Sequence, residues 1–133
     1  MFDWDEPRHG LGHVPMDDTH REFLHLCREL AAAPDEEWPA RLLVLASHTQ
    51  AHFAEEERLM RETAFSSRQE HESEHRRLLG EAASMLKSLE RGRTVFAKAW
   101  LKNLPGWFVT HVATMDSALA AHLKAISVNK CPR

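Results

Sequence analysis

Residues 48–60, HTQAHFAEEERLM, place an imidazole and a carboxylate on the apolar face of a helix. On an α-helix His52 and Glu56 lie one turn apart, about 40° around the axis and about 6 Å along it, so both can reach one point beside the helix. Small or apolar residues share that face at three- and four-residue intervals: Leu42, Leu45, Ala46, Thr49, Phe53, Leu59 and Met60. Because an unpaired buried carboxylate is costly, an inward Glu56 must be neutralised, hydrogen-bonded or coordinated. The segment predicts a metal-binding pair, or else a Glu56 at the edge of the face.

Length and composition fit a single soluble domain. The 133 residues are 43% hydrophobic and 28% charged, which is enough for a core of its own. We expect one domain over 1–133, with an N-terminal arm (1–16), a helical bundle (17–127) and a short tail (128–133). The sequence leaves the oligomeric state and any protein partner open, with a monomer among the options.

Charge, hydropathy and cysteine content narrow the setting. A net charge of -3 gives no reason to expect nucleic acid or an anionic membrane as a partner. The chain starts without a basic segment followed by an apolar run, and it has no apolar stretch long enough to cross a bilayer. The two cysteines, Cys27 and Cys131, do not suggest a disulfide framework. These features favour a cytoplasmic protein.

The first two helices are predicted from caps and proline positions. Asp17 or Asp18 can cap a helix that ends before Pro34, after an irregular arm whose anchor is expected to be Trp4. Asp35 can cap a second helix that runs to about 63, with a proline at 39 tolerated in its opening turn.

The third and fourth helices follow with short connections. Ser67 and Glu70 have the spacing of a capping box, and Gly92 should end that helix after about residue 91. Thr94 can cap the fourth, in which Pro105 should cause a kink or a junction of two helices at Leu104. The fold class expected is therefore all-α, an antiparallel up-down four-helix bundle with an irregular N-terminal arm.

Inward polar residues recur on all four predicted helices. Stepping along each apolar face gives His20, His52, Glu56, His71, His75, His111 and Asp116. On a regular helix His111 and Asp116 lie about 140° apart, too far for an easy chelate of one ion, whereas two ions would accommodate both. The donors are too many for one tetrahedral zinc, and a mixture of imidazole and carboxylate suits iron, copper or manganese. The pattern predicts a two-metal site in the core.

The sequence resembles the hemerythrin family, in particular its short bacterial single-domain members, the bacteriohemerythrins. The resemblance covers nearly the whole chain and rests on four motifs: MDDTH at 16–20, HFAEEERLM at 52–60, HESEH at 71–75 and WFVTHVATMD at 107–116.

This resemblance implies a non-haem di-iron centre that binds O2 reversibly, in an oxygen carrier, store or local supplier rather than an enzyme. It implies that Glu56, Asp116 and an oxo or hydroxo group bridge the two irons. One iron would be held by the residues at His71, His75 and His111. The other would be held by those at His20 and His52, and would keep a vacant position for O2.

Several neighbours of these residues have two interpretations. Trp107 and Phe108 would line the O2 pocket or simply pack in the core, and His48 would be a second-shell hydrogen-bond partner or an edge residue. Glu55 and Glu57 are predicted to be solvated. Four further histidines are assigned to the surface or the arm: His9, His13, His25 and His122.

Three other functions remain open. A di-iron oxidase or peroxidase would use Glu-x-x-His motifs such as Glu22 to His25 and Glu72 to His75, although Glu22 and His25 should face away from His20. A sensor would convert O2 or redox state into a change recognised by a partner. A bundle whose core histidines are only hydrogen-bonded would need partners for five inward imidazoles.

Overall fold

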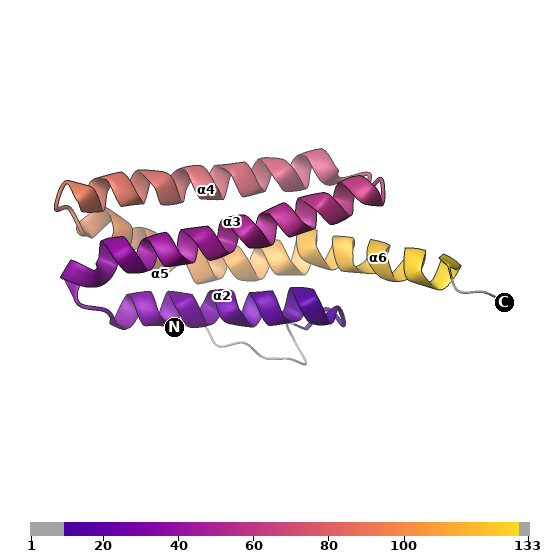
Figure 1. Ribbon diagram of the computed structural model, residues 1–133, viewed down its shortest axis with the longest axis horizontal. Coiled ribbons are helices and arrows are strands. Elements are labelled where there is room, and N and C mark those ends of the chain that lie inside the picture. Colours follow the sequence, from indigo (N-terminus) through magenta and orange to yellow (C-terminus); the bar gives the residue numbers. More distant parts are fainter. Residues whose placement is uncertain (1–9, 131–133) are drawn as a thin grey trace.

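The computed structural model describes residues 10–130 and arranges its helices as a bundle (Figure 1). The elements are α2 (Val14–Ala32), a 3-10 turn η1 (Asp35–Glu37), α3 (Trp38–Glu62), α4 (Arg68–Glu90), α5 (Val95–His111), a π-helical segment η2 (Val112–Asp116) and α6 (Ser117–Lys130). Successive long helices run in opposite directions, and α5, η2 and α6 together form the fourth one (Figure 1). The all-α four-helix bundle is thus confirmed. No helix within the described residues is long and apolar enough to cross a membrane.

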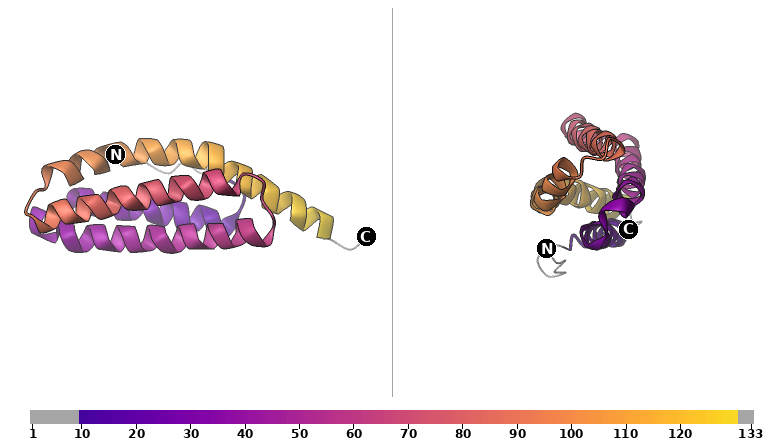
Figure 2. Two further views of the ribbon diagram at one scale, coloured as in Figure 1. Left: turned by 90° about the horizontal axis from the view of Figure 1, so that it is seen from above. Right: turned by 90° about the vertical axis from the view of Figure 1, so that its left-hand side faces the viewer.

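The helices close around a common interior. Helix α3 packs against both α2 and α4, and α5 contacts α4 and α2. The end view shows the four rods around one axis, while the side view shows α6 extending past the others at an angle to α5 (Figure 2). The short connections between consecutive helices explain the antiparallel order.

Helix α2 begins three residues earlier than the sequence predicted. His13, and neither Asp17 nor Asp18, is its N-cap, with Nδ1 accepting a hydrogen bond from the Met16 backbone N–H at 3.3 Å. The Asp17 carboxylate instead turns back and accepts the Leu11 N–H at 2.8 Å. The cap prediction was wrong because an imidazole nitrogen, like a carboxylate oxygen, can accept the hydrogen bond from a backbone N–H of the first turn. Trp4 and His9 lie outside the described residues.

The other helix ends show which caps make bonds. Asp35 makes no capping bond and begins the 3-10 turn that leads into α3, so that cap prediction was wrong, whereas the proline at 39 does lie in the first turn of α3. Ser67 is the N-cap of α4 but its side chain makes no capping hydrogen bond. Gly92 has a φ of 77°, and Arg93 N–H donates to the Ser88 carbonyl at 2.9 Å, which closes the predicted glycine-ended helix.

The fourth rod is interrupted at a different place from the one predicted. Helix α5 continues through Pro105, so the junction of two helices expected at Leu104 is wrong. Regular hydrogen bonding changes instead at η2, where the Ser117 N–H donates to the Val112 carbonyl five residues back. A π-helical turn inserts one residue into an α-helix and occurs frequently at functional sites. This one lies between His111 and Asp116.

The apolar interior falls into two clusters on either side of the polar residues. The larger one comprises Phe23, Leu24, Cys27, Leu30, Trp38, Leu42, Leu45, Phe53, Leu78, Leu89, Ala97, Leu101, Leu104, Phe108 and Val112. The smaller one comprises Met16, Met60, Leu119 and Ala120. Burial raises the pKa of the Cys27 thiol to about 12, so this cysteine acts as an apolar core residue. Cys131 lies outside the described residues.

Adjacent leucines on α3 test the packing. Leu42 is fully buried in the larger cluster, whereas its neighbour Leu43 is 55% exposed. Leu42→Ala should lower the free energy of unfolding by about 2–5 kcal/mol, since it leaves a cavity in a close-packed core. Leu43→Ala should change it by less than about 0.5 kcal/mol. Urea denaturation of both variants measures the difference, and equal effects would contradict the observed orientation of α3.

Candidate metal centre

The polar interior of the bundle is formed by seven side chains. None of them exceeds 8% exposure: His20, His52, Glu56, His71, His75, His111 and Asp116. They come from all four rods, so the complete set exists only in the folded bundle. The structure therefore brings together every residue predicted to bind metal.

These side chains form two overlapping groups that could each hold an ion. One consists of Glu56, His71, His75 and His111, and the other of His20, His52, Glu56 and Asp116. Within each group one ligand atom per residue lies within 4.8 Å of all the others. One group thus contains three imidazoles and the other two, with Glu56 common to both.

Each carboxylate directs its two oxygens to different groups. Glu56 Oε1 lies 3.1 Å from His75 Nε2, whereas its Oε2 lies 2.8 Å from His52 Nε2. Asp116 Oδ1 lies 3.1 Å from His111 Nε2, whereas its Oδ2 lies 2.9 Å from His20 Nε2. This division is the arrangement in which one carboxylate can contact two neighbouring ions.

The close approach of these atoms does not satisfy them as hydrogen-bonding groups. Both oxygens of Glu56 and of Asp116 are buried without a hydrogen bond of acceptable geometry, as are His52 Nε2, His71 Nε2 and His75 Nε2. Buried polar atoms in folded proteins nearly always have a partner, so a set that converges without one calls for another occupant. Imidazole nitrogens and carboxylate oxygens suit a transition metal such as iron. The donor set therefore fits two metal ions.

Charges inside the cluster stabilise one another against burial. Burial and the neighbouring Asp116 oppose ionisation of Glu56, yet the imidazoles of His52 and His71 outweigh both and hold the pKa of Glu56 below its ordinary value. Burial likewise opposes ionisation of Asp116, but His111, His20 and His71 hold its pKa well below normal. The carboxylates are therefore ionised at neutral pH and available as ligands.

The same carboxylates make the imidazoles more basic. Burial disfavours protonated His71, but Asp116 and Glu56 overcome it and raise the pKa of His71 to about 9. For His52, burial also acts against protonation, and Glu56 again raises the pKa. A metal has to displace protons from these nitrogens, so metal binding weakens as the pH falls.

The π-helical segment η2 brings His111 and Asp116 together. On a regular α-helix the two would point about 140° apart, which is why the sequence predicted that they could not easily share one ion. In a π-turn, hydrogen bonds join residues five apart, so such residues lie nearly above one another. His111 Nε2 and Asp116 Oδ1 consequently lie 3.1 Å apart, closer than the angle of a regular helix predicts, while the two residues belong to different candidate groups, as predicted for two ions.

Aromatic rings contact four of the site imidazoles: His20, His52, His75 and His111. Phe53 stacks on His75, with ring centroids 3.7 Å apart and planes 4° apart, and Trp107 stacks on His111 at 4.8 Å. Phe108 contacts the edge of the His20 ring at 5.4 Å. These contacts hold ligand rings in place and exclude water. That Trp107 and Phe108 line an O2 pocket remains a prediction.

Sequence reasoning missed a carboxylate that holds one of the imidazoles. Glu57 was predicted to be solvated, but His75 Nδ1 donates a hydrogen bond to Glu57 Oε2 at 3.0 Å. Its side chain is only 27% exposed, whereas Glu55 is exposed and pairs with Arg58 as predicted for a solvated residue. The missing signal is geometric, because the bond joins α3 to α4 and no spacing within one helix reveals it.

A second carboxylate positions Trp107. The indole Nε1–H donates to Glu74 Oε1 at 3.1 Å, and the Arg77 guanidinium lies 6.0 Å from the centre of the same ring system. The Arg77 hydrogen bond lowers the pKa of Glu74 to about 2, although partial burial acts the other way. Trp107 is thereby fixed against His111.

The other histidines among residues 10–130 lie outside the cluster. His48 Nε2 lies 3.4 Å from the Thr19 carbonyl and its other nitrogen 3.8 Å from Glu22, so it joins α3 to α2 without touching a site imidazole in these contacts. His25 is exposed and pairs with Glu29, as predicted. His122 is half-buried and lies 3.0 Å from the Thr63 carbonyl, which is an interior role that the surface assignment missed.

The interior of the bundle holds two carboxylates between a set of three imidazoles and a set of two. This arrangement is that of a protein with a non-haem dimetal site. Residues 13–123 match the family model described as the hemerythrin HHE cation binding domain, and the chain belongs to the hemerythrin family. Together, the family and the His/Glu/Asp groups support a di-iron centre.

The chain is also similar in sequence and in fold to individual hemerythrins. The bacteriohemerythrin of Ralstonia nicotianae is 28% identical over 123 residues, which cover 92% of this chain and 89% of that protein. The myohemerythrin of Sipunculus nudus is 26% identical over 113 residues, covering 85% and 86%. A crystal structure of wild-type hemerythrin superposes with a TM-score of 0.82 over 92% of this chain and 98% of that one, at 21% identity, which shows the shared fold.

Neighbouring glutamates test the bond to His75. Glu57→Gln should weaken iron binding by about 10- to 100-fold, because a carboxylate on the outer nitrogen orients a ligand imidazole and makes it a better donor. Glu55→Gln is the matched control, since Glu55 is exposed and pairs with Arg58. Competition with a chelator measures both affinities. The same affinity for the two variants would show that Glu57 does not support the site.

Proposed function

We propose that the protein binds O2 reversibly at a di-iron centre and serves as an oxygen carrier, store or local supplier. The observation that carries the proposal is the unequal division of five imidazoles, three in one group and two in the other, around Glu56, which both groups share. An ion with fewer protein ligands keeps room for an external molecule, whereas an ion with more is closed. Family membership supports iron as the metal and O2 as the ligand.

In this proposal His71, His75 and His111 hold one iron, and His20 and His52 hold the other. Glu56 and Asp116 bridge the two, supported by the way their oxygens face different groups. A solvent-derived oxo or hydroxo group would complete the bridge. The two irons, each able to change between ferrous and ferric, would supply the redox chemistry of O2 binding.

The protein's own contribution is to hold the ligands and keep the site dry. Phe53 covers His75, Phe108 covers His20, and Trp107 covers His111. Apolar rings packed on the imidazoles limit the contact of water and protons with the centre, which favours release of O2 unchanged over its reduction. The Glu-x-x-His motifs considered for an oxidase contribute only His75 to the cluster, since Glu22 and His25 are exposed and Glu72 pairs with Arg61 and Arg68.

Cycling of O2 tests the function directly. The iron-loaded protein, reduced without oxygen, should gain a visible absorption band on exposure to O2 and lose it again under vacuum over repeated cycles. Iron analysis of the same sample should give about two ions per chain. Conversion in a single step to a stable oxidised spectrum, or steady consumption of a reducing substrate, would overturn the proposal in favour of redox catalysis.

Two histidines on opposite faces test the ligand assignment. His75→Ala should reduce the iron content and lower the thermal midpoint, because it removes a ligand and leaves a cavity beside Phe53. His25→Ala should change neither, because His25 is exposed and contacts only Glu29 among the ion pairs described for it. Metal analysis and thermal denaturation compare them. Equal iron content in both would refute the assignment.

A further inference from the structure

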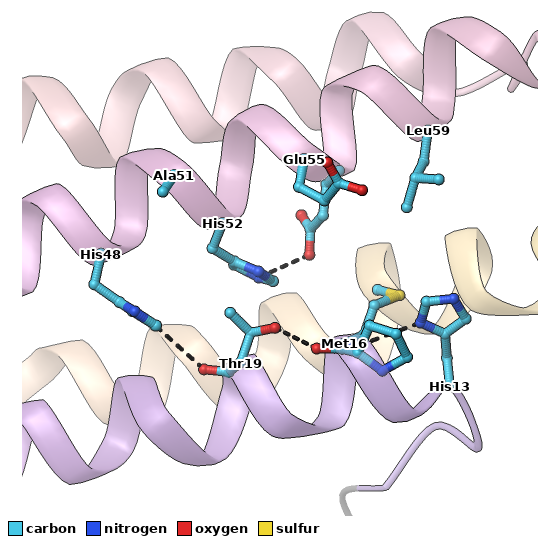
Figure 3. Close-up of a pocket in the computed structure, with 10 residues that line it drawn as sticks. His13, Met16, Thr19, His48, Ala51, His52, Glu55 and Leu59 are labelled. Carbon is cyan, nitrogen blue, oxygen red and sulfur yellow. Dashed lines mark hydrogen bonds and ion pairs between the residues drawn. The ribbon is translucent and has the colours of Figure 1, made fainter.

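A cavity of about 390 Å³ lies between α2 and α3 and reaches the metal-binding residues (Figure 3). Three of its lining residues are buried and mark its inner end: Met16, His52 and Glu56. Its outer part is formed by exposed or half-buried residues, among them Ala51 and Leu59. The cavity therefore leads from the surface to the centre of the bundle.

The inner end meets the half of the cluster with two imidazoles. His52 belongs to that half, and the Glu56 oxygen close to His52, Oε2, is the one directed to it. Figure 3 shows His52 and its dashed contact to the carboxylate, between Ala51 on one side and Met16 on the other. A molecule entering here would arrive at the ion with fewer protein ligands.

The walls of the cavity suit a small uncharged molecule. Pro15, Met16, Ala51 and Leu59 present mainly aliphatic or thioether surface. Nonpolar gases such as O2 and nitric oxide partition from water into such surroundings, whereas ions lose hydration there without compensation. The mainly apolar part of the wall thus favours uncharged molecules over ions, although His48 and Glu55 also line the cavity.

A second, smaller cavity lies near the cluster, and a larger share of its lining is polar, although Phe65, Met115 and Ala118 also line it. It occupies about 250 Å³ beside α4 and η2, reaches His71, and is lined in part by Ser67, Glu70 and Thr114. His71 belongs to the half with three imidazoles. Hydroxyl and carboxylate groups favour water over a nonpolar gas.

We propose that the cavity between α2 and α3 is the route by which small uncharged gases reach the His20 and His52 half of the centre. That the physiological gas is O2 rests on the proposed function. The path itself is inferred from the structure. His48 helps to keep the path in place, since its Nε2 lies near the Thr19 carbonyl across the two helices. The polar cavity beside His71 is the competing route.

Ala51 provides a way to block the path. Ala51→Trp should place an indole in the cavity and slow O2 association and dissociation equally, by about tenfold, leaving the equilibrium affinity unchanged, because a barrier alters the path and not its end points. Ala54→Trp is the matched control, since Ala54 is exposed on the same helix and does not line the cavity. Leu59→Ala, which widens the cavity, should speed both steps. Stopped-flow absorption of the iron-loaded protein measures these rates.

Xenon offers a test that does not depend on iron chemistry. Crystals of the iron-loaded protein under xenon pressure should show the gas between Met16 and Leu59, and Ala51→Trp should abolish it. Unchanged rates in Ala51→Trp would overturn the proposal even if xenon binds, and so would a slowed association with an unaltered dissociation. Should O2 oxidise the protein irreversibly, the proposed function fails, while nitric oxide association with the ferrous form tests the route with the same variants.

Discussion

The mutual attraction of buried imidazoles and carboxylates is the interaction on which this structure depends. Glu56 and Asp116 are almost completely inaccessible, and isolated charges in such a position would cost more than a small bundle can offset. The histidines around them hold both carboxyl pKa values below normal despite burial. Several of their buried nitrogens and oxygens nevertheless have no hydrogen bond of acceptable geometry, and metal ions would satisfy these atoms. The cluster therefore forms only when the bundle folds, because every rod contributes at least one of its residues.

Much of this arrangement could be predicted from helical spacing. The one-turn intervals of His52 and Glu56, and of His71 and His75, identify inward pairs because side chains four apart share a face. Gly92 follows the end of α4 with a positive φ, a backbone conformation that favours glycine, so this helix end could be predicted from the residue type. The predictions that were wrong concern side chains with several possible hydrogen-bond partners. Asp17 bonds to Leu11 and leaves the cap to His13, and Glu57 crosses to α4 to meet His75. Such choices depend on distances between helices, which a single helix pattern does not contain.

The π-helical segment η2 could not be predicted from the spacing of apolar residues. With the constant angle per residue of a regular helix, His111 and Asp116 point about 140° apart, and two ions accommodate both. In the structure the angle between successive residues is smaller within η2, so residues five apart along the chain lie nearly above one another. A π-turn weakens regular hydrogen bonding, and its position between two cluster residues indicates that the cluster compensates for it. Proline at 105, the obvious candidate for a break, remains inside a continuous helix.

The surroundings of the two halves of the site differ as much as their ligands do. The half with three imidazoles is fixed from outside: Glu57 holds His75, Phe53 stacks on the same ring, and Trp107 stacks on His111 while bound to Glu74. The half with two imidazoles meets the cavity between α2 and α3 at His52. Under the proposed function, a centre that binds and releases a small molecule without losing its metals would need one rigid side and one accessible side. Most of the supporting contacts lie on the half with three imidazoles, although Phe108 also contacts His20, and the larger of the two cavities opens on the half with two.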